Sequence, residues 1–278
     1  MPPLRAGDRR IALDSPVVMG VLNVTPDSFS DGGLHAEPTA AIAAGLRLAE
    51  EGATFVDVGG ESTRPGAPSV PLEEELARVI PVIRALVREG VCVSLDTRKS
   101  EVMRQGLEVG VHGINDVMAL RSPGAMEAVA ASGAAVFLMH MQGEPGTMQQ
   151  APNYRDVTLE VRTFLRSRVD ACVTAGIARE RLVIDPGFGF GKTLDHNLAL
   201  LRGLPSLCAE GLPVLAGLSR KSMLQALTGR AVDDRLAGSL ALALAAVSGG
   251  ARIIRAHDVA ATVDALKVWA AVGGRSGA

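Results

Sequence analysis

The chain has 278 residues, of which 47% are hydrophobic and 21% charged, so it can bury one large core or two small ones. Its net charge of −2 provides no basic excess, which argues against nucleic acid or an anionic membrane as a partner. Aromatic residues make up only 3% of the chain, so stacking platforms for single-stranded nucleic acid are not expected either.

Neither a signal peptide nor a membrane span is expected. Residues 1–10 carry charges but no apolar segment. The longest uncharged run, residues 236–251, is shorter than the roughly 20 residues that a span needs, so we interpret it as a buried helix. Cys92, Cys172 and Cys208 are odd in number and widely separated, which indicates reduced, buried thiols and a cytoplasmic protein.

Short apolar runs alternate with helical patterns along the whole chain. The β-branched character of the runs is typical of parallel strands buried on both faces. The eight predicted strands are residues 17–24, 55–59, 91–96, 113–117, 135–140, 182–185, 214–218 and 253–257. The predicted helices are residues 38–51, 72–89, 99–109, 123–132, 156–175, 193–202, 221–227 with 233–248, and 258–270. Helix C-caps are expected at the glycines that follow these helices, Gly52, Gly90, Gly110, Gly133, Gly176, Gly211 and Gly250.

Eight β/α units in one chain predict a TIM (β/α)8 barrel, an α/β fold. The alternative is a doubly wound open sheet. The barrel is favoured because polar residues follow nearly every strand, whereas an open sheet would concentrate them at one switch point. No linker is visible, so we expect residues 1–278 to form a single domain with its core at about 15–270.

The loops after the first two strands are long and polar. The first, residues 23–33, is rich in turn formers and suits either a mobile lid or a surface turn. The second, residues 57–66, combines hydroxyls, glycines and Arg64. It suits a phosphate or pyrophosphate, although a capping box with a solvated arginine is the plainer interpretation.

Carboxylates and an amide end three other strands, at Asp96, Asn115 and Asp185. Each could simply cap the following helix. At the mouth of one barrel they would form a ring of acceptors for a heterocycle with a guanidine-like edge, whose paired N–H groups a carboxylate accepts bidentately. The loop after Asp185, PGFGFGK at residues 186–192, leaves backbone room for a flat ligand.

The last two strands are followed by cationic and hydroxyl groups. Lys221 can donate to the same heterocycle, and Ser222 lies at a helix start, where free N–H groups hold anions. Arg255 and His257 are two residues apart and therefore share one face of a strand. His257 could instead cap the helix that follows it. For His140, a packing role is favoured over a site role.

The sequence contains no zinc or iron signature, such as H-E-x-x-H or C-x-x-C. A Mg²⁺ held largely by substrate phosphates needs only one or two protein oxygens, and Asn23 can supply one.

Several of these motifs together closely resemble the dihydropteroate synthases. The matching segments are MGVLNVTPDSFSDGG at 19–33, DVGGESTRPG at 57–66, DPGFGFGK at 185–192, SRKS at 219–222 and RAHD at 255–258. The resemblance covers essentially residues 15–270. It implies a homodimeric transferase of folate biosynthesis, a sulfonamide target, that condenses 6-hydroxymethyl-7,8-dihydropterin diphosphate with 4-aminobenzoate. The implied products are 7,8-dihydropteroate and pyrophosphate, and Mg²⁺ is the implied cofactor.

The same resemblance implies a role for each matching position. Asp96, Asp185 and Lys221 would be the catalytic groups. The pterin would contact Asp96, Asn115, Met139, Asp185, Phe190, Gly217 and Lys221. The diphosphate would contact Asn23, Thr63, Arg64, Arg255 and His257, with Asn23 also on Mg²⁺. The aminobenzoate site would use Phe29, Thr63, Pro65, Phe190, Lys221 and Ser222.

Two rival functions remain on the sequence alone. A pterin-dependent methyltransferase would share the barrel and the pterin pocket, but it would not need the diphosphate cluster of Arg64, Arg255 and His257. A non-catalytic pterin-binding paralogue is the second rival, and the intact loop motifs argue against it.

Overall fold

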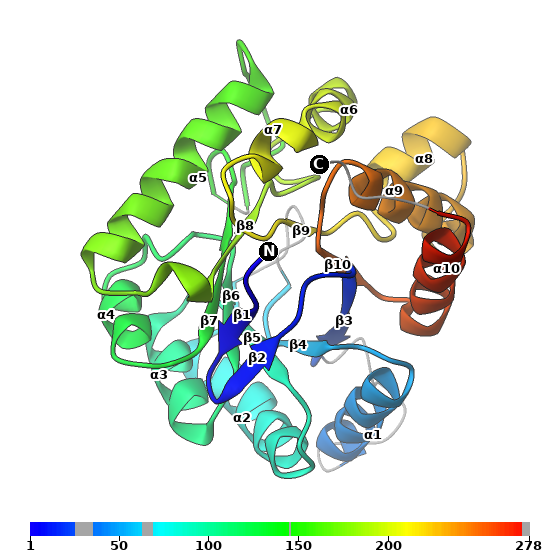
Figure 1. The fold of residues 1–278 in the computed structure, drawn as a ribbon. Helices are drawn as coiled ribbons and strands as arrows, with labels where there is room; N and C mark the ends of the chain where they lie inside the picture. Colours follow the sequence, from blue (N-terminus) through cyan, green and yellow to red (C-terminus); the bar gives the residue numbers. More distant parts are fainter. Residues whose placement is uncertain (26–35, 63–68, 145, 274–278) are drawn as a thin grey trace.

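The predicted barrel is present in the computed structural model, which describes residues 1–25, 36–62, 69–144 and 146–273 (Figure 1). Its parallel strands are β3 (Val17–Asn23), β4 (Phe55–Gly59), β5 (Val93–Asp96), β6 (Gly113–Asp116), β7 (Ala135–Met139), β8 (Leu182–Asp185), β9 (Leu215–Ala216) and β10 (Ile253–Ala256). They pair in the order β8-β7-β6-β5-β4-β3-β10-β9. A parallel bridge between Ile184 and Val214 joins the two edges of this sheet, so the doubly wound alternative is wrong.

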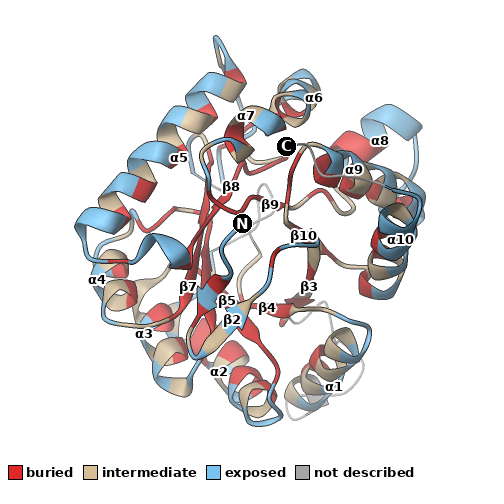
Figure 2. Cartoon of the chain, in the orientation of Figure 1, coloured by how far each residue is buried: buried red, intermediate tan, exposed pale blue. Residues whose placement is uncertain are grey.

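Helices surround the strands, with apolar faces turned inward and exposed faces outward (Figure 2). They are α1 (Ala36–Glu50), α2 (Leu72–Arg88), α3 (Ser100–Val109), α4 (Ala125–Ala130), α5 (Val157–Thr174), α6 (Leu194–Arg202), α7 (Leu204–Cys208), α8 (Ser222–Thr228), α9 (Leu236–Ser248) and α10 (Val259–Ala271). The sequence did not predict α7, which begins after Gly203 and has proline in its first turn. All the predicted glycine caps except Gly133 have the positive φ that terminates a helix without strain.

A short N-terminal hairpin, which the sequence does not predict, precedes the barrel strands. Strands β1 (Leu4–Ala6) and β2 (Arg9–Ile11) pair antiparallel and lie in front of the strand ring in Figure 1. Leu4 packs in one buried cluster with Phe55 and Phe137, which point into the barrel from β4 and β7. Strands of three residues that contain arginines are too short to show a periodic pattern. This segment is ordered because its apolar side chains cover the open end of the barrel.

Leu4→Ala is expected to lower the free energy of unfolding by about 2–4 kcal/mol, because it leaves a cavity in this plug. Leu4 is only 1% exposed. Leu159→Ala is the matched control, since Leu159 is 48% exposed and should change stability by about 0.5 kcal/mol or less. Chemical denaturation of both variants measures the difference. Equal effects would show that the hairpin does not seal the barrel.

The barrel interior changes from apolar to polar along the strand direction. Side chains two residues apart share one face of a strand. Buried apolar residues point inward near the strand starts, and polar residues follow them two positions later. The pairs are Phe55 and Asp57, Cys92 and Ser94, Val183 and Asp185, and Ile253 and Arg255. The polar layer therefore lies at the carboxyl ends of the strands, where TIM barrels carry their active sites.

Candidate active site

A fully buried carboxylate, Asp57, is the centre of the polar layer. Its Oδ1 accepts a hydrogen bond from the Ser94 hydroxyl at 2.6 Å, and its Oδ2 accepts one from the Asn115 amide at 2.9 Å. Nε of Arg255 donates to the same Oδ2 at 2.6 Å. Four strands thus meet at one side chain, and the partners offset the cost of burying its charge.

Arg255 also bridges from Asp57 to Asp96. One terminal nitrogen of the guanidinium donates to Asp96 Oδ2 at 2.8 Å. Burial alone lowers the pKa of Arg255, but the two carboxylates outweigh burial and raise it above its ordinary value. Burial raises the pKa of Asp96 to about 7, against the lowering effect of Arg255. The guanidinium is therefore a fixed positive charge held between two buried carboxyl groups.

Asp185 presents a second buried carboxyl group at the end of β8. Its Oδ1 accepts a hydrogen bond from the backbone N–H of Gly187 at 2.7 Å. Within the described residues no hydrogen bond reaches Oδ2, so that oxygen remains available to a ligand. Burial raises the pKa of Asp185 to about 6, although the Gly187 N–H and the charges of Lys221 and Arg255 lower it.

An apolar wall stands beside these carboxyl groups. Met139 is buried in a cluster with Met141 and Met148, and Phe190 packs against that cluster. The ammonium of Lys221 lies 4.2 Å from the centre of the Phe190 ring, a cation–π contact. A flat heterocycle could therefore contact the wall while its polar edge meets Asp96, Asn115 and Asp185.

His257 lies half-buried just after β10. Its Nδ1 is 3.0 Å from the Ser219 hydroxyl, and its backbone N–H donates to the same oxygen at 3.2 Å. Burial, together with the nearby charges of Arg255 and Arg220, lowers the pKa of His257 to about 4. The imidazole is thus a neutral hydrogen-bonding group at pH 7 until an anion binds beside it.

An ion-pair cluster lies beside the site. Glu61 accepts hydrogen bonds from Arg98 at 2.9 Å and from Lys99 at 2.5 Å. Lys99 also pairs with Glu75, which accepts a hydrogen bond from Thr97. Burial raises the pKa of Glu61, but its bonds to Lys99 and Arg98 outweigh burial and lower it. These two cations are therefore engaged within the protein.

Most of the predicted site residues lie at the carboxyl ends of the strands or in the segments that directly follow them. Those in the described part of the chain are Asn23, Asp96, Asn115, Met139, Asp185, Phe190, Gly217, Lys221, Ser222, Arg255 and His257. Phe29, Thr63, Arg64 and Pro65 lie outside the described residues.

The capping alternative fails for the three acceptors at the strand ends. Helices α3, α4 and α6 follow Asp96, Asn115 and Asp185, and their N-cap residues are Lys99, Gly124 and Thr193 instead. The side chains of Asp96, Asn115 and Asp185 therefore do not cap these helices.

Asp57 and Ser94 were missed as site residues, because each looks like part of an otherwise apolar strand. Their spacing along the strands could have identified them, because side chains two residues apart point to the same face of a strand. Asp57 is two residues before Gly59, and Ser94 is two residues before Asp96, so both share the inward face of their strands. The buried Lys192, in the loop after β8, was not singled out either, because a single lysine in a glycine-rich loop has no periodic partner.

No cluster of three or more His, Cys, Asp or Glu residues is placed to hold a metal ion within the described ranges. The described helices include none that is long and apolar enough to cross a membrane. All three cysteines are free. Burial raises the pKa of Cys92 to about 12 and that of Cys172 to about 11, so neither thiol is a ready nucleophile.

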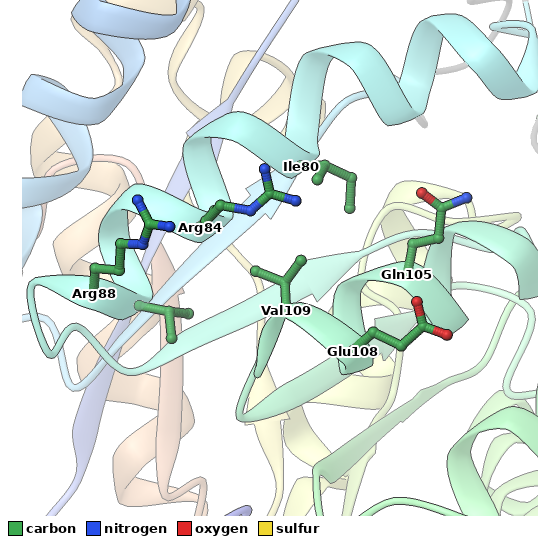
Figure 3. Close-up of a pocket in the computed structure, with 7 residues that line it drawn as sticks. Ile80, Arg84, Arg88, Gln105, Glu108 and Val109 are labelled. Carbon is green, nitrogen blue, oxygen red and sulfur yellow. The ribbon is translucent and has the colours of Figure 1, made fainter.

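A separate pocket of about 380 Å³ lies in the outer ring between α2 and α3 (Figure 3). Its lining residues are Ile80, Arg84, Val87, Arg88, Gln105, Glu108 and Val109. They come from the C-terminal halves of both helices, which run antiparallel to the strands. The pocket therefore lies nearer to the strand starts than to the polar layer at the strand ends.

Fold and site together are typical of a barrel enzyme with its polar groups gathered at the strand ends. In agreement, residues 19–257 match the family model described as "Pterin binding enzyme". The chain is also 53% identical over 257 residues to the dihydropteroate synthase of Escherichia coli K12, an alignment that covers 92% of this chain and 91% of that protein. The chain belongs to the dihydropteroate synthase family.

Solved structures of this family share the fold. A Xanthomonas albilineans dihydropteroate synthase with 4-aminobenzoic acid superposes with a TM-score of 0.92, at 57% identity and 98% coverage of both chains. The same enzyme with 7,8-dihydropteroate gives a TM-score of 0.90, at 54% identity and 98% coverage of both chains. A Yersinia pestis dihydropteroate synthase in a sulfonamide drug complex gives 0.92, at 47% identity, with coverage of 97% of this chain and 98% of that one.

Proposed function

We propose that this chain condenses 6-hydroxymethyl-7,8-dihydropterin diphosphate with 4-aminobenzoate to form 7,8-dihydropteroate and pyrophosphate. The observation that carries the proposal is the buried layer around Asp57. There Arg255 lies in contact with Asp96 and beside Asn115, so acceptors for a pterin adjoin a cation for a diphosphate.

Asp185, Asp96 and Asn115 anchor the pterin in this proposal. Oδ2 of Asp185 accepts from the ligand while Oδ1 stays bonded to Gly187. The Asn115 amide donates to Asp57, which orients its carbonyl oxygen for the ligand. Met139, Phe190 and Gly217 wall the ring, and Lys221 donates to it from above Phe190.

Arg255, His257, Asn23, Thr63 and Arg64 hold the diphosphate. Arg255 is already a permanent charge at the mouth, and an arriving anion would raise the low pKa of His257 and favour its protonation.

Asn23 fits a Mg²⁺ that is held mainly by the diphosphate. It ends β3 at the mouth, and within the described residues its side chain makes no hydrogen bond. One amide oxygen suits a hard cation that keeps substrate and water oxygens as its other ligands. When bound, the ion supplies positive charge to the leaving group.

The aminobenzoate site is formed by Phe190, Lys221 and Ser222 together with Phe29, Thr63 and Pro65. Ser222 is the exposed first residue of α8, and Lys221 precedes it as the N-cap. A carboxylate is favoured beside an ammonium and the free N–H groups of a helix start.

The reaction needs no strong base in this arrangement. The C–O bond between the pterin methylene and the diphosphate breaks, and its electron pair leaves with the pyrophosphate oxygen. Arg255 stabilises that negative charge, while Asp96 and Asp185 stabilise the cationic methylene. The aniline nitrogen then bonds to the methylene carbon and loses a proton to solvent.

A homodimer is the proposed assembly, with residues 1–278 forming one barrel domain in each protomer. Helix α9 carries no charged side chain, and its outward face includes Leu236, which is 41% exposed, and the exposed Ala241 and Ala245. Burying this face would remove apolar surface from water. Sedimentation of the wild-type protein and of Leu236→Glu tests whether the protein is a dimer through this face.

The three free cysteines support a cytoplasmic location.

A pyrophosphate-release assay with and without 4-aminobenzoate tests the function. Release that requires aminobenzoate and yields dihydropteroate is the expected result. A pterin-dependent methyltransferase or a silent paralogue would release no pyrophosphate under either condition. Release that is indifferent to aminobenzoate would contradict the proposed second substrate.

Pterin affinity is expected to fall as the pH decreases through about 6. Asp185 must be ionised for Oδ2 to accept from the pterin while Oδ1 accepts from Gly187, and its pKa is raised to about 6. Below that pH the affinity should fall by about tenfold per unit, because protonation removes an acceptor. Calorimetry with a phosphate-free pterin between pH 5 and 8 measures the change. A constant affinity across this range would contradict the assigned role of the carboxylate.

A further inference from the structure

A buried lysine lies inside the glycine-rich loop that follows β8. Lys192 is only 3% exposed. Its ammonium donates to the carbonyl oxygens of Gly187 at 2.9 Å and Phe190 at 3.0 Å. It also lies 3.1 Å from Nδ1 of His140, at the end of β7. The mechanism above makes no use of this group.

His140 is suited to accept from that ammonium. It is 6% exposed and packs edge-on against Phe164, with ring centres 5.0 Å apart. Burial, together with the nearby charge of Lys192, lowers the pKa of His140 to about 3, so the imidazole is neutral. Burial lowers the pKa of Lys192 to about 7, and Asp185 acts in the opposite direction. The predicted packing role of His140 is therefore combined with a hydrogen bond.

The loop backbone is bent so that its carbonyls point at one place. Gly187, Gly189 and Gly191 have φ of 67°, 81° and 59°, in the left-handed region that favours glycine. A Cβ on Gly187 would lie 1.9 Å from the backbone oxygen of His140. Convergent carbonyl dipoles repel one another unless a cation or donor lies between them, and Lys192 supplies that donor.

This loop connects Asp185 with Phe190, two residues of the proposed pterin site. Asp185 precedes it and bonds to the N–H of Gly187, the same residue whose carbonyl accepts from Lys192. Phe190 lies within it, and its carbonyl is the second acceptor. Because Lys221 rests on the Phe190 ring, the position of that second ammonium also depends on the loop.

We propose that Lys192, held by His140, is a positioning residue that fixes Asp185 and Phe190 in the geometry that binds the pterin. The inference rests on the proposed function, since it assigns the loop to pterin recognition. It differs from a general stabilising role, because Arg255 and His257 form no hydrogen bond or ion pair with residues 186–192 in the described part of the chain.

Lys192→Met tests the inference, because methionine has similar length and no donor. Pterin affinity should fall by at least tenfold, the loss expected when buried carbonyl acceptors are left without a donor, while pyrophosphate affinity stays unchanged. The matched control is Lys267→Met on α10, where an exposed lysine pairs with Asp264. Calorimetry with a phosphate-free pterin and with Mg²⁺-pyrophosphate measures both affinities.

A ligand-free measurement reports the loop itself. Incorporation of 4-fluorophenylalanine labels the phenylalanines, and Phe190→Leu assigns the Phe190 ¹⁹F signal. This signal should shift in Lys192→Met and keep its position in Lys267→Met. If the wild-type protein bound no pterin, the proposed function would fail, whereas the ¹⁹F result would still decide whether Lys192 positions the loop.

His140 provides a second pair of variants in case Lys192→Met does not fold. His140→Gln keeps an acceptor for the ammonium and should retain pterin affinity within a few fold. His140→Leu removes the acceptor and should lose at least tenfold. Equal affinities for these two variants, an unshifted Phe190 signal in a folded Lys192→Met, or equal loss of pterin and pyrophosphate would each overturn the proposal.

Discussion

Asp185→Asn is expected to weaken pterin binding by roughly 2–4 kcal/mol while the protein stays folded. An amide keeps one oxygen for the Gly187 N–H, so the loop retains its internal hydrogen bond. The second position becomes an N–H₂ donor, which faces the N–H groups of the ligand and leaves them unpaired. Calorimetry gives the affinity, and steady-state kinetics should show a matching loss of kcat/KM.

Asp116→Asn is the matched control for this substitution. Asp116 is also a buried strand-end carboxylate, and burial raises its pKa to about 6. Its oxygens accept from the backbone N–H groups of Met118 and Leu120 and are therefore not offered to a ligand. It should lose stability with little change in pterin affinity. Near-normal pterin affinity in a folded Asp185→Asn would remove Asp185 from the pterin site.

Arg255→Ala is expected to have two separable effects. Pyrophosphate affinity should fall by at least tenfold, because a charged donor is lost, while affinity for a phosphate-free pterin stays nearly unchanged. The free energy of unfolding should fall by about 3–5 kcal/mol, since fully buried Asp57 loses its counter-charge. Calorimetry and denaturant titration measure the two quantities.

A double variant separates these effects. Asp57→Asn in the Arg255→Ala background removes the unpaired buried charge, so stability should partly recover while pyrophosphate binding does not. Arg104→Ala is the surface control, because Arg104 also pairs with two carboxylates, Glu101 and Glu108, but its side chain is 52% exposed. Its removal should change stability by about 1 kcal/mol or less. Equal loss of pterin and pyrophosphate binding in Arg255→Ala would mean that Arg255 only supports the barrel.

Much of the site was predictable because short stretches of the sequence specify the strand ends on which its residues lie. The strand that ends in Asp185 is a short apolar run followed by a glycine-rich loop, and strand β8 ends at that residue. Likewise, Arg255 and His257 have the parity of one strand face, and Arg255 points into the barrel as that parity requires. The motifs at these positions also carried the family resemblance that the comparisons confirm.

The sequence by itself therefore determined the order of the eight barrel strands, and that Arg255 and His257 share one face of the last strand. Both follow from periodicity within a few residues. Only the tertiary structure decided which polar groups are partners. Asp57 and Arg255 are 198 residues apart, and they meet because barrel closure and strand register bring β4 and β10 to the same interior layer. The hairpin over the opposite end has the same origin, since its apolar side chains are ordered only by the open barrel beneath them.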